Sequence, residues 1–364
     1  MEDNRCTIPF TGVPQLHLYN NTISPCCKVQ SSALEKGRGA LTGKFIEIRQ
    51  AVIKNERSPL CNACWKIDDL GGSSFRKKYS HHVQNPLDWE NLDVNAQPTG
   101  IEIAFSNKCQ LMCVYCSPTV SSMWEDAQTR FIRFVQPADK AKEDFNIHEI
   151  LDINSLKIVQ VTGGEPMLAD KCIEFLLNLP VDNNRQMSIV TNLSYGKAVF
   201  STLESILNRH KNMYVLCSLD AVGENITRKH LNWELWDRNF RLLADNLQER
   251  RKLFSHQAIM IKLTMNIMNY MNANDIIEYA LSFRKRGVKG ITFDINPIAH
   301  NQMTSMSSGK VDSSFKIVLN KQDAALLNPR EVSLITQHNI FLDNVKLDTD
   351  LEKRTESYLK EYLK

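Results

Sequence analysis

The sequence predicts an α/β protein built on a mostly parallel sheet, and three observations support this class. Six short runs rich in β-branched residues alternate with longer amphipathic segments between residues 100 and 300. Each run is apolar enough to be covered on both faces, which is typical of parallel strands. Strands that alternate with helices pair in parallel through right-handed crossovers. Six such units form either an open doubly wound sheet or a partial barrel.

The alternation assigns residue ranges to both kinds of element. The expected strands are 100–105, 158–163, 187–192, 213–220, 259–266 and 291–297. The expected helices are 121–135, 197–210, 233–254 and 273–287. The second of these helices places Val199, Leu203, Ile206 and Leu207 on one face. Chemistry in both architectures gathers at the carboxyl ends of the strands, so polar residues there are the first candidates for a site.

The first 99 residues have a different character. They are turn-rich, hold five cysteines, and contain one expected hairpin at 15–27 with an Asn-Asn turn. Residues 85–100 are expected to link this part to the first strand. After about residue 300 a polar loop leads into charged helical sequence. Three parts follow from this division: a cysteine-rich domain at 1–99, the strand–helix domain at 100–300, and an extension at 301–364.

Composition excludes some classes of protein. Of 364 residues 43% are apolar, which allows a large core, and no run of 18 or more apolar residues predicts a membrane span. The N-terminus has no basic and apolar signal pattern, so a cytoplasmic protein is expected. The net charge is +3, from 44 basic and 41 acidic residues, which gives no support for a nucleic-acid partner.

Cysteine usage is the strongest feature. Ten cysteines in a reducing compartment indicate metal or catalytic sites, not disulfides, and eight of them lie in the first third of the chain. Cys172 and Cys217 stand alone in apolar surroundings and are expected in the core.

Three cysteines follow the first expected strand as Cys109-x3-Cys113-x2-Cys116. Three thiolates on one loop can hold three irons of a cubane cluster and leave the fourth iron to a small molecule with its own donor atoms. Zinc is the alternative, although a site with three cysteines would need a fourth ligand or a water.

This pattern resembles the signature of radical S-adenosylmethionine (radical SAM) enzymes. The resemblance rests on the CxxxCxxC loop with Tyr115 before its last cysteine, and on "VTGGEPML" at 161–168, which is similar to the GGE segment of that family. It covers residues 100–300 and implies a partial (β/α)6 TIM-like barrel. It also implies a [4Fe–4S] cluster on Cys109, Cys113 and Cys116. In that family the cluster cleaves SAM reductively, and the resulting 5′-deoxyadenosyl radical abstracts hydrogen from a substrate.

The resemblance also assigns a SAM site at the strand ends. Gly163 and Gly164 would let the backbone approach a ligand closely, and Glu165 or neighbouring carbonyls can accept from an ammonium group. The candidates outside the GGEP turn, which lie at the ends of later strands, could equally be cap or turn residues. The whole set is Gly163, Gly164, Glu165, Pro166, Thr191, Asn192, Ser218, Asp220, Arg228, Asn266 and Tyr115. No residue is assigned a catalytic role.

The N-terminal cysteines resemble the auxiliary-cluster segment called twitch or SPASM, which usually follows the barrel and here precedes it. The implied ligands of a second [4Fe–4S] cluster are Cys6, Cys26, Cys61 and Cys64, with Cys26 chosen over Cys27 on spacing. Four thiolates suit zinc almost as well on spacing alone. Full ligation would give this cluster a role in electron transfer.

Three classes of function therefore remain. The leading class is a radical SAM oxidoreductase or modifying enzyme, acting on a small molecule or peptide with an electron donor such as flavodoxin or ferredoxin. The second is a zinc-binding module that recognises nucleic acid or protein without catalysis. The third is a scaffold that holds clusters but does not cleave SAM.

Overall fold

The computed structural model describes residues 4–34, 39–69, 74–80, 87–131, 147–253, 258–266, 268–297 and 316–344. The chain divides into two compact units. The first unit comprises Met1–Lys108 and Phe134–Met187, and the second comprises Cys109–Arg133 and Ser188–Lys364. The predicted domain limits at residues 99 and 300 stay predictions.

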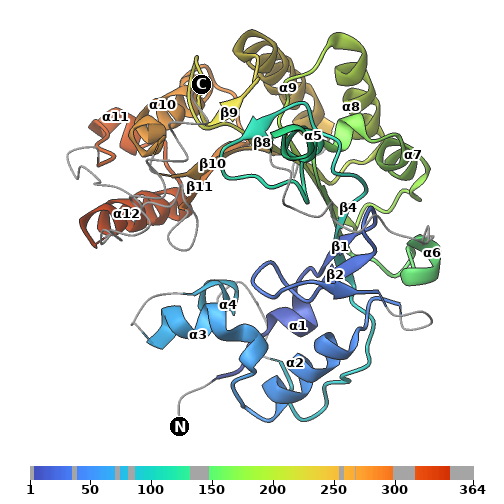
Figure 1. Cartoon of the computed structure of the whole chain (residues 1–364). Coiled ribbons are helices and arrows are strands. Elements are labelled where there is room, and N and C mark those ends of the chain that lie inside the picture. Colours follow the sequence, from blue (N-terminus) through green and yellow to red (C-terminus); the bar gives the residue numbers. More distant parts are fainter. Residues whose placement is uncertain are drawn as a thin grey trace. The chain divides into compact units, whose positions relative to one another are not determined.

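The first unit contains strands in the order β6-β4-β1-β2-β3. They are β1 (Gln15–His17), β2 (Thr22–Ser24), β3 (Ser32–Ala33), β4 (Gly100–Ala104) and β6 (Ile158–Thr162). β4 pairs in parallel with β6 on one side and with β1 on the other, while β1, β2 and β3 are antiparallel (Figure 1). The N-terminal hairpin therefore extends the sheet beyond the first predicted strand.

Short helices complete the first unit. They are α1 (Ile8–Thr11), α2 (Gly43–Ile53), η1 (Pro59–Cys61), α3 (Asn62–Asp69), α4 (Phe75–Ser80), α6 (Ile147–Ile150), η2 (Pro166–Leu168) and α7 (Asp170–Asn178). α2 lies in a region expected to be turns, and it buries Phe45, Ile48, Arg49 and Val52. Burial lowers the pKa of Arg49 to about 10, but its guanidinium donates to the carbonyls of Pro9, Val94 and Ala96.

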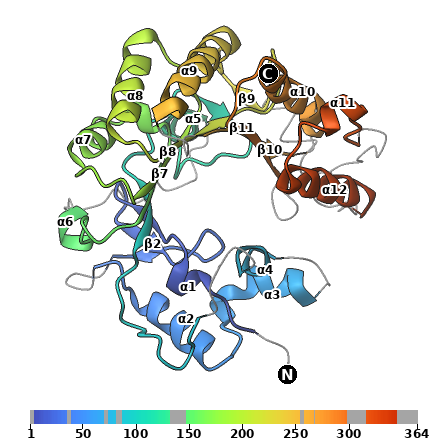
Figure 2. The same ribbon diagram turned by 180° about the vertical axis from the view of Figure 1, so that it is seen from behind.

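The second unit contains the remaining strands. They are β5 (Met112–Cys113), β8 (Met213–Ser218), β9 (Arg228–Lys229), β10 (Ile259–Met265) and β11 (Ile291–Pro297), while β7 (Gln186–Thr191) crosses the unit boundary. β10 pairs in parallel with β8 and β11. Its helices are α5 (Ser122–Phe131), α8 (Lys197–Arg209), α9 (Trp233–Leu253), η3 (Tyr270–Asn272), α10 (Ala273–Lys285), α11 (Lys321–Ala324) and α12 (Pro329–Asn344). α10 and α12 pack against β11 (Figure 2).

Most sequence expectations about elements are confirmed. All six predicted strands and all four predicted helices are present, with shifts of one or two residues at their ends; residues 132–135, 254, 301–315 and 345–364 lie outside the described residues. The hairpin turn is also confirmed, with Asn21 at φ 52°. Cys172 and Cys217 are fully buried, as expected of core cysteines. The α/β class with mostly parallel strands is confirmed, while the partial barrel stays a prediction.

Within the part of the chain that the structure describes, no helix combines the length and the apolar character needed to cross a membrane.

Candidate functional site

The cysteine loop of the second unit is held in a two-stranded ribbon. β5 pairs antiparallel with β9, and the register places Cys113 opposite Arg228. The Val114 amide donates to the Thr227 carbonyl at 2.9 Å, and the Cys116 amide donates to the Cys113 carbonyl at 2.9 Å. Sequence reasoning missed this partner, because Arg228 lies 115 residues beyond Cys113 and β9 is only two residues long.

The beginning of α5 holds the same loop. The Cys109 amide donates to Ser122 Oγ at 3.1 Å, and this hydroxyl donates to the Cys109 carbonyl at 3.2 Å. The Trp124 indole donates to the Cys113 carbonyl at 2.8 Å, and the Ser121 hydroxyl donates to the Leu111 carbonyl at 3.1 Å. Together with the ribbon, these bonds hold the backbone that carries the three cysteines.

The three thiols differ in burial. Cys113 is buried, and Cys109 and Cys116 are half-buried. Burial raises the pKa of the Cys113 thiol to about 12, against the opposing effect of Arg228 beside it. Burial also raises the pKa of Cys116. Metal ligation at this loop would therefore release protons, since thiols bind metals as thiolates.

Two of the three sulfur atoms face side-chain donors. Asn192 Nδ2 lies 3.9 Å from Cys109 Sγ, and Arg228 Nη1 lies 3.8 Å from Cys113 Sγ. The Leu111 amide also donates to Cys109 Sγ at 3.4 Å. Both side chains were predicted as SAM contacts, and the structure places them against the cysteine loop.

A buried carboxylate, Asp220, connects several predicted site residues. It accepts from the Tyr115 hydroxyl at 2.8 Å and from the Thr227 hydroxyl at 3.0 Å, and it lies 3.2 Å from Arg228 Nε. The guanidinium of Arg228 also lies over the Tyr115 ring at 5.4 Å. Burial by itself lowers the pKa of Arg228, but Asp220 raises it above the ordinary value, so the guanidinium stays charged. Burial raises the pKa of Tyr115, which stays neutral.

The GGEP turn belongs to the first unit and packs on the segment that leads into the cysteine loop. Gly163 has φ +128°, and a Cβ there would lie 2.7 Å from the Ser106 carbonyl oxygen. A Cβ on Gly164 would lie 2.5 Å from the Asn107 carbonyl oxygen and closer still to that of Lys108. The structure thus shows why glycine is needed at both positions: the turn passes close to the backbone of residues 106–108. Sequence reasoning did not predict this contact.

Glu165 and the residues after it form a capped turn. The Glu165 amide donates to the Lys108 carbonyl at 2.7 Å, and its buried carboxylate accepts from the Met167 amide at 3.2 Å. Pro166 begins η2, where its missing N–H costs nothing. The predicted contact between this turn and a SAM ammonium group stays a prediction.

The other strand-end candidates make local contacts. Thr191 Oγ1 accepts from the Leu193 amide at 3.0 Å, and Asn266 Oδ1 accepts from the Met268 amide at 2.9 Å. Ser218 is half-buried at the end of β8. These contacts are those of turn residues, and their predicted roles in binding SAM stay predictions.

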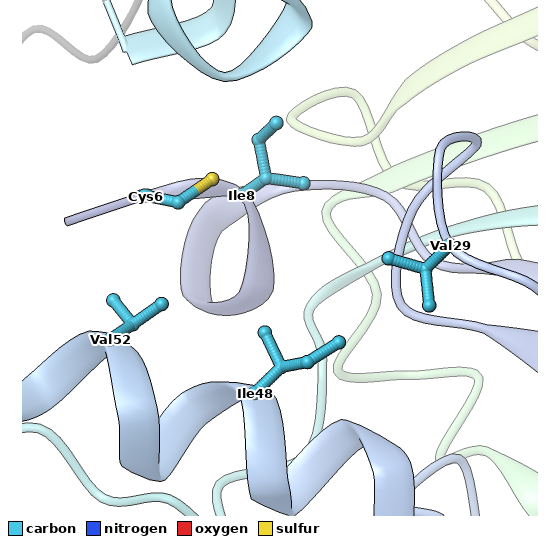
Figure 3. Packing of buried hydrophobic residues seen from close by; sticks show 5 residues of the cluster. All are labelled: Cys6, Ile8, Val29, Ile48 and Val52. Carbon is cyan, nitrogen blue, oxygen red and sulfur yellow. The ribbon is translucent and has the colours of Figure 1, made fainter. Parts of the chain in front are cut away.

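The N-terminal cysteines gather in one pocket of the first unit. Cys6, Cys26, Cys61 and Cys64 all line it, whereas Cys27 is exposed and does not belong to the lining. Cys6 packs in one hydrophobic cluster with Ile8 and with Ile48 and Val52 of α2, and Figure 3 shows its sulfur directed toward Ile8. Burial raises the pKa of Cys6 and of Cys61 to about 12, and in each the neighbouring thiols add to the effect.

A buried arginine that sequence reasoning missed lines the same pocket. Arg76 lies over the Trp65 ring at 4.6 Å, and Trp65 directly follows Cys64. Its Nε and Nη2 both donate to Asp68 Oδ2, at 3.0 and 2.7 Å. An arginine in the sequence gives no signal of such burial, because the residue is usually exposed.

The residues of both sets fit an iron–sulfur cluster by their chemistry. Within the described residues, no group of three or more His, Cys, Asp or Glu side chains is arranged to hold one metal ion. Soft thiolates are nevertheless the usual ligands of iron–sulfur clusters. One set places three thiols on a single fixed loop, and the other lines one pocket with four thiols. The donor type and number therefore suit a cluster in each place.

No family model matches the sequence. The chain is similar to the radical SAM cyclopropyl synthase TigE of Paramaledivibacter caminithermalis, with 24% identity over 265 residues, or 67% of this chain and 53% of the relative. It is also similar to the GTP 3′,8-cyclases of Listeria welshimeri, with 27% identity over 205 residues, and of Listeria monocytogenes, with 25% identity over 204 residues. Each cyclase match covers 55% of this chain and 55% of the relative.

The chain thus spans about half the length of the curated relatives it matches, 53% to 55%. These relatives are radical SAM enzymes, and each has low identity to the chain.

Proposed function

We propose that the chain reductively cleaves SAM to a 5′-deoxyadenosyl radical, which abstracts hydrogen from a small molecule or peptide. The observation that carries the proposal is the three-cysteine loop. Its backbone is fixed by the β5–β9 ribbon and by α5, and two of its sulfur atoms face N–H donors. The similarity to radical SAM relatives supports the same chemistry.

Each part of the chain has a distinct task in this proposal. Cys109, Cys113 and Cys116 hold the cluster, and the bound cluster supplies the electron that breaks a carbon–sulfur bond of SAM. The loop backbone, which β9 and α5 hold in place, carries these three cysteines. The Asp220 carboxylate and the Arg228 guanidinium neutralise each other in a buried position behind the loop, where they exclude water without leaving an unpaired charge.

SAM binding is assigned to the GGEP turn and the strand ends. In the turn, the carbonyls beside Glu165 supply acceptors for an ammonium group. At the strand ends, hydroxyl, amide and carboxylate groups suit the ribose and the methionine carboxylate. The residues proposed for these contacts are Gly163, Gly164, Glu165, Pro166, Thr191, Asn192, Ser218, Asp220, Arg228, Asn266 and Tyr115.

Cys6, Cys26, Cys61 and Cys64 are proposed to hold a second [4Fe–4S] cluster. The pocket they share supports this set, and the exposure of Cys27 supports Cys26 as the ligand. Four thiolates leave no iron open to a substrate, which favours a role in electron transfer. An electron donor such as flavodoxin or ferredoxin is the expected partner of the protein, and a cytoplasmic location stays an expectation.

The metal content of anaerobically purified protein tests the assignment. We expect a brown protein that contains iron at both sites, and we expect the Cys109→Ala, Cys113→Ala, Cys116→Ala variant to lose about half of it, since each cubane carries about four irons. The matched control is Cys27→Ala, which removes an exposed thiol and should keep all the iron. A colourless protein that contains zinc would contradict the proposal and favour a binding module, because zinc is d¹⁰ and has no visible absorption.

A further inference from the structure

Two side-chain amides join the cysteine loop to the end of β7. Gln110 Nε2 donates to Asn192 Oδ1 at 3.0 Å, and Asn192 Nδ2 donates to Gln110 Oε1 at 3.1 Å. Backbone groups of Ser194 fix both orientations. Its amide donates to Asn192 Oδ1 at 3.0 Å, and its carbonyl accepts from Gln110 Nε2 at 2.9 Å. Rotating either amide by 180° would set two donors or two acceptors against each other, so neither orientation is ambiguous.

This arrangement directs one N–H of Asn192 at a cysteine. An amide nitrogen carries two N–H groups, and Gln110 takes one of them. The other faces Cys109 Sγ, 3.9 Å from Asn192 Nδ2. Asn192 is 6% exposed, so water has little access to compete for this N–H. The sulfur thus has a donor whose direction is set by three other hydrogen bonds.

A second donor faces the next cysteine in an equally constrained way. The β5–β9 register places Arg228 opposite Cys113, and Arg228 Nη1 lies 3.8 Å from Cys113 Sγ. The same guanidinium is held by Asp220, 3.2 Å from Nε. A planar guanidinium can serve both partners at once, whereas the single ammonium of a lysine offers no such fork.

We propose that Asn192 and Arg228 are positioning residues that donate to the sulfur atoms of Cys109 and Cys113 and thereby raise the reduction potential of the cluster on this loop. The inference rests on the proposed function and deepens it. Reduction adds one negative charge to a cluster, so N–H donors and a cation at its sulfur ligands stabilise the reduced form more than the oxidised form. This role needs no SAM, which separates it from the direct SAM contacts proposed for the same residues.

The test is the midpoint potential of the loop cluster, measured by redox titration of the full chain in the absence of SAM. The signal that disappears in the Cys109→Ala, Cys113→Ala, Cys116→Ala variant identifies this cluster. Asn192→Asp keeps the acceptor for the Ser194 amide but removes the N–H that faces Cys109. Arg228→Lys keeps the positive charge but replaces the planar guanidinium, whose N–H groups can reach Asp220 and Cys113 at once, by a single ammonium. Asn208→Asp is the matched control, because it makes the same change on the exposed face of α8.

We expect both variants to retain iron and to shift the potential downward. Only the difference between the stabilisation of the reduced and of the oxidised cluster shifts the potential, so the equilibrium constant for reduction should fall by up to about tenfold, or about 59 mV for one electron. The Asn208→Asp control should match the wild type. If Asn192→Asp does not assemble the cluster, Asn192→Ser, which adds no charge, decides in its place. Unchanged potentials in the iron-loaded variants would overturn the inference, whereas a wild type without a cluster at this loop would overturn the proposed function itself.

Discussion

Arg76 and Asp68 form a buried ion pair beside the N-terminal cysteines, with 2.7 Å between Arg76 Nη2 and Asp68 Oδ2. Their side chains are 8% and 1% exposed. Arg76 Nη1 also donates to the carbonyl of Arg5, directly before Cys6, at 3.1 Å. One side chain of α4 therefore ties the segment of Cys6 to α3, which carries Cys64.

Breaking this pair from one side should destabilise the first unit strongly. Arg76→Leu leaves the Asp68 carboxylate buried, and among the described residues Lys77, 3.5 Å away, is the remaining cation beside it. We expect the free energy of unfolding to fall by about 3 kcal/mol. Urea denaturation measures it. Arg57→Leu is the matched control, because Arg57 pairs with Asp69, the neighbour of Asp68 on α3. The side chains of this pair are 37% and 54% exposed, so its loss should lower the free energy of unfolding by less than about 1 kcal/mol. Equal losses in the two variants would contradict this explanation.

The same pair predicts a pH dependence of stability. Burial by itself raises the pKa of Asp68, but hydrogen bonds from Arg76 and Ser74 outweigh it and hold the pKa below the ordinary 3.8. The unfolded chain therefore binds this proton more readily than the folded chain. The stabilisation is present above about pH 4 and is lost as the pH falls through the folded pKa. As the pH is lowered below about 4, the urea midpoint of unfolding should fall more steeply in the wild type than in Asp68→Asn. If the midpoints of the two proteins depend on pH in the same way, this assignment is wrong.

Gly164→Ala should disturb the cysteine loop through its backbone. The new Cβ would strike the carbonyls of Asn107 and Lys108, so the segment before Cys109 must move. We expect a loss of about 1–3 kcal/mol in stability and less iron at the loop. Gly196→Ala is the matched control, since a Cβ there meets nothing within 4 Å. Full iron content in Gly164→Ala would show that the loop does not depend on this contact.

Removing two N-terminal cysteines should abolish the second cluster and leave the cluster of the Cys109–Cys116 loop in place. We expect Cys61→Ala, Cys64→Ala to lose about half of the iron, since each cubane carries about four irons. The variant should still form 5′-deoxyadenosine but fail to complete turnover on the substrate. Iron analysis and the SAM-cleavage assay measure the two effects. An unchanged iron content, or zinc in the wild-type pocket, would return this pocket to a purely structural role.

The sequence predicted the parallel strands well because each carries its own signal. β4, for example, buries Ile101 and Ile103, and its β-branched run is visible without knowledge of its neighbours. The parallel pairing of β1 with β4 was not predicted, because three residues of β1 carry no information about which strand they join. The helix α2 did have a signal, since Phe45, Ile48, Arg49 and Val52 follow helical spacing, but an arginine at a core position obscured it.

The site shows the same division. The cysteine motif could be found from spacing alone, because its members are close in sequence. The contacts around it could not, since Arg228 and Asn192 reach the loop only through the fold. The glycines of the GGEP turn were found, but the close contact with Asn107 and Lys108 depends on strand packing that no local pattern encodes.

The cleavage of SAM by the reduced protein tests the central claim most directly. Anaerobically reduced wild type should convert SAM to 5′-deoxyadenosine and methionine, both detected by chromatography. The Cys109→Ala, Cys113→Ala, Cys116→Ala variant should stay folded, because Cys109 and Cys116 are only half-buried and alanine keeps an apolar side chain at the buried Cys113. It should form no product above the background without enzyme. Product formation by this triple variant, or none by an iron-loaded wild type, would contradict the account.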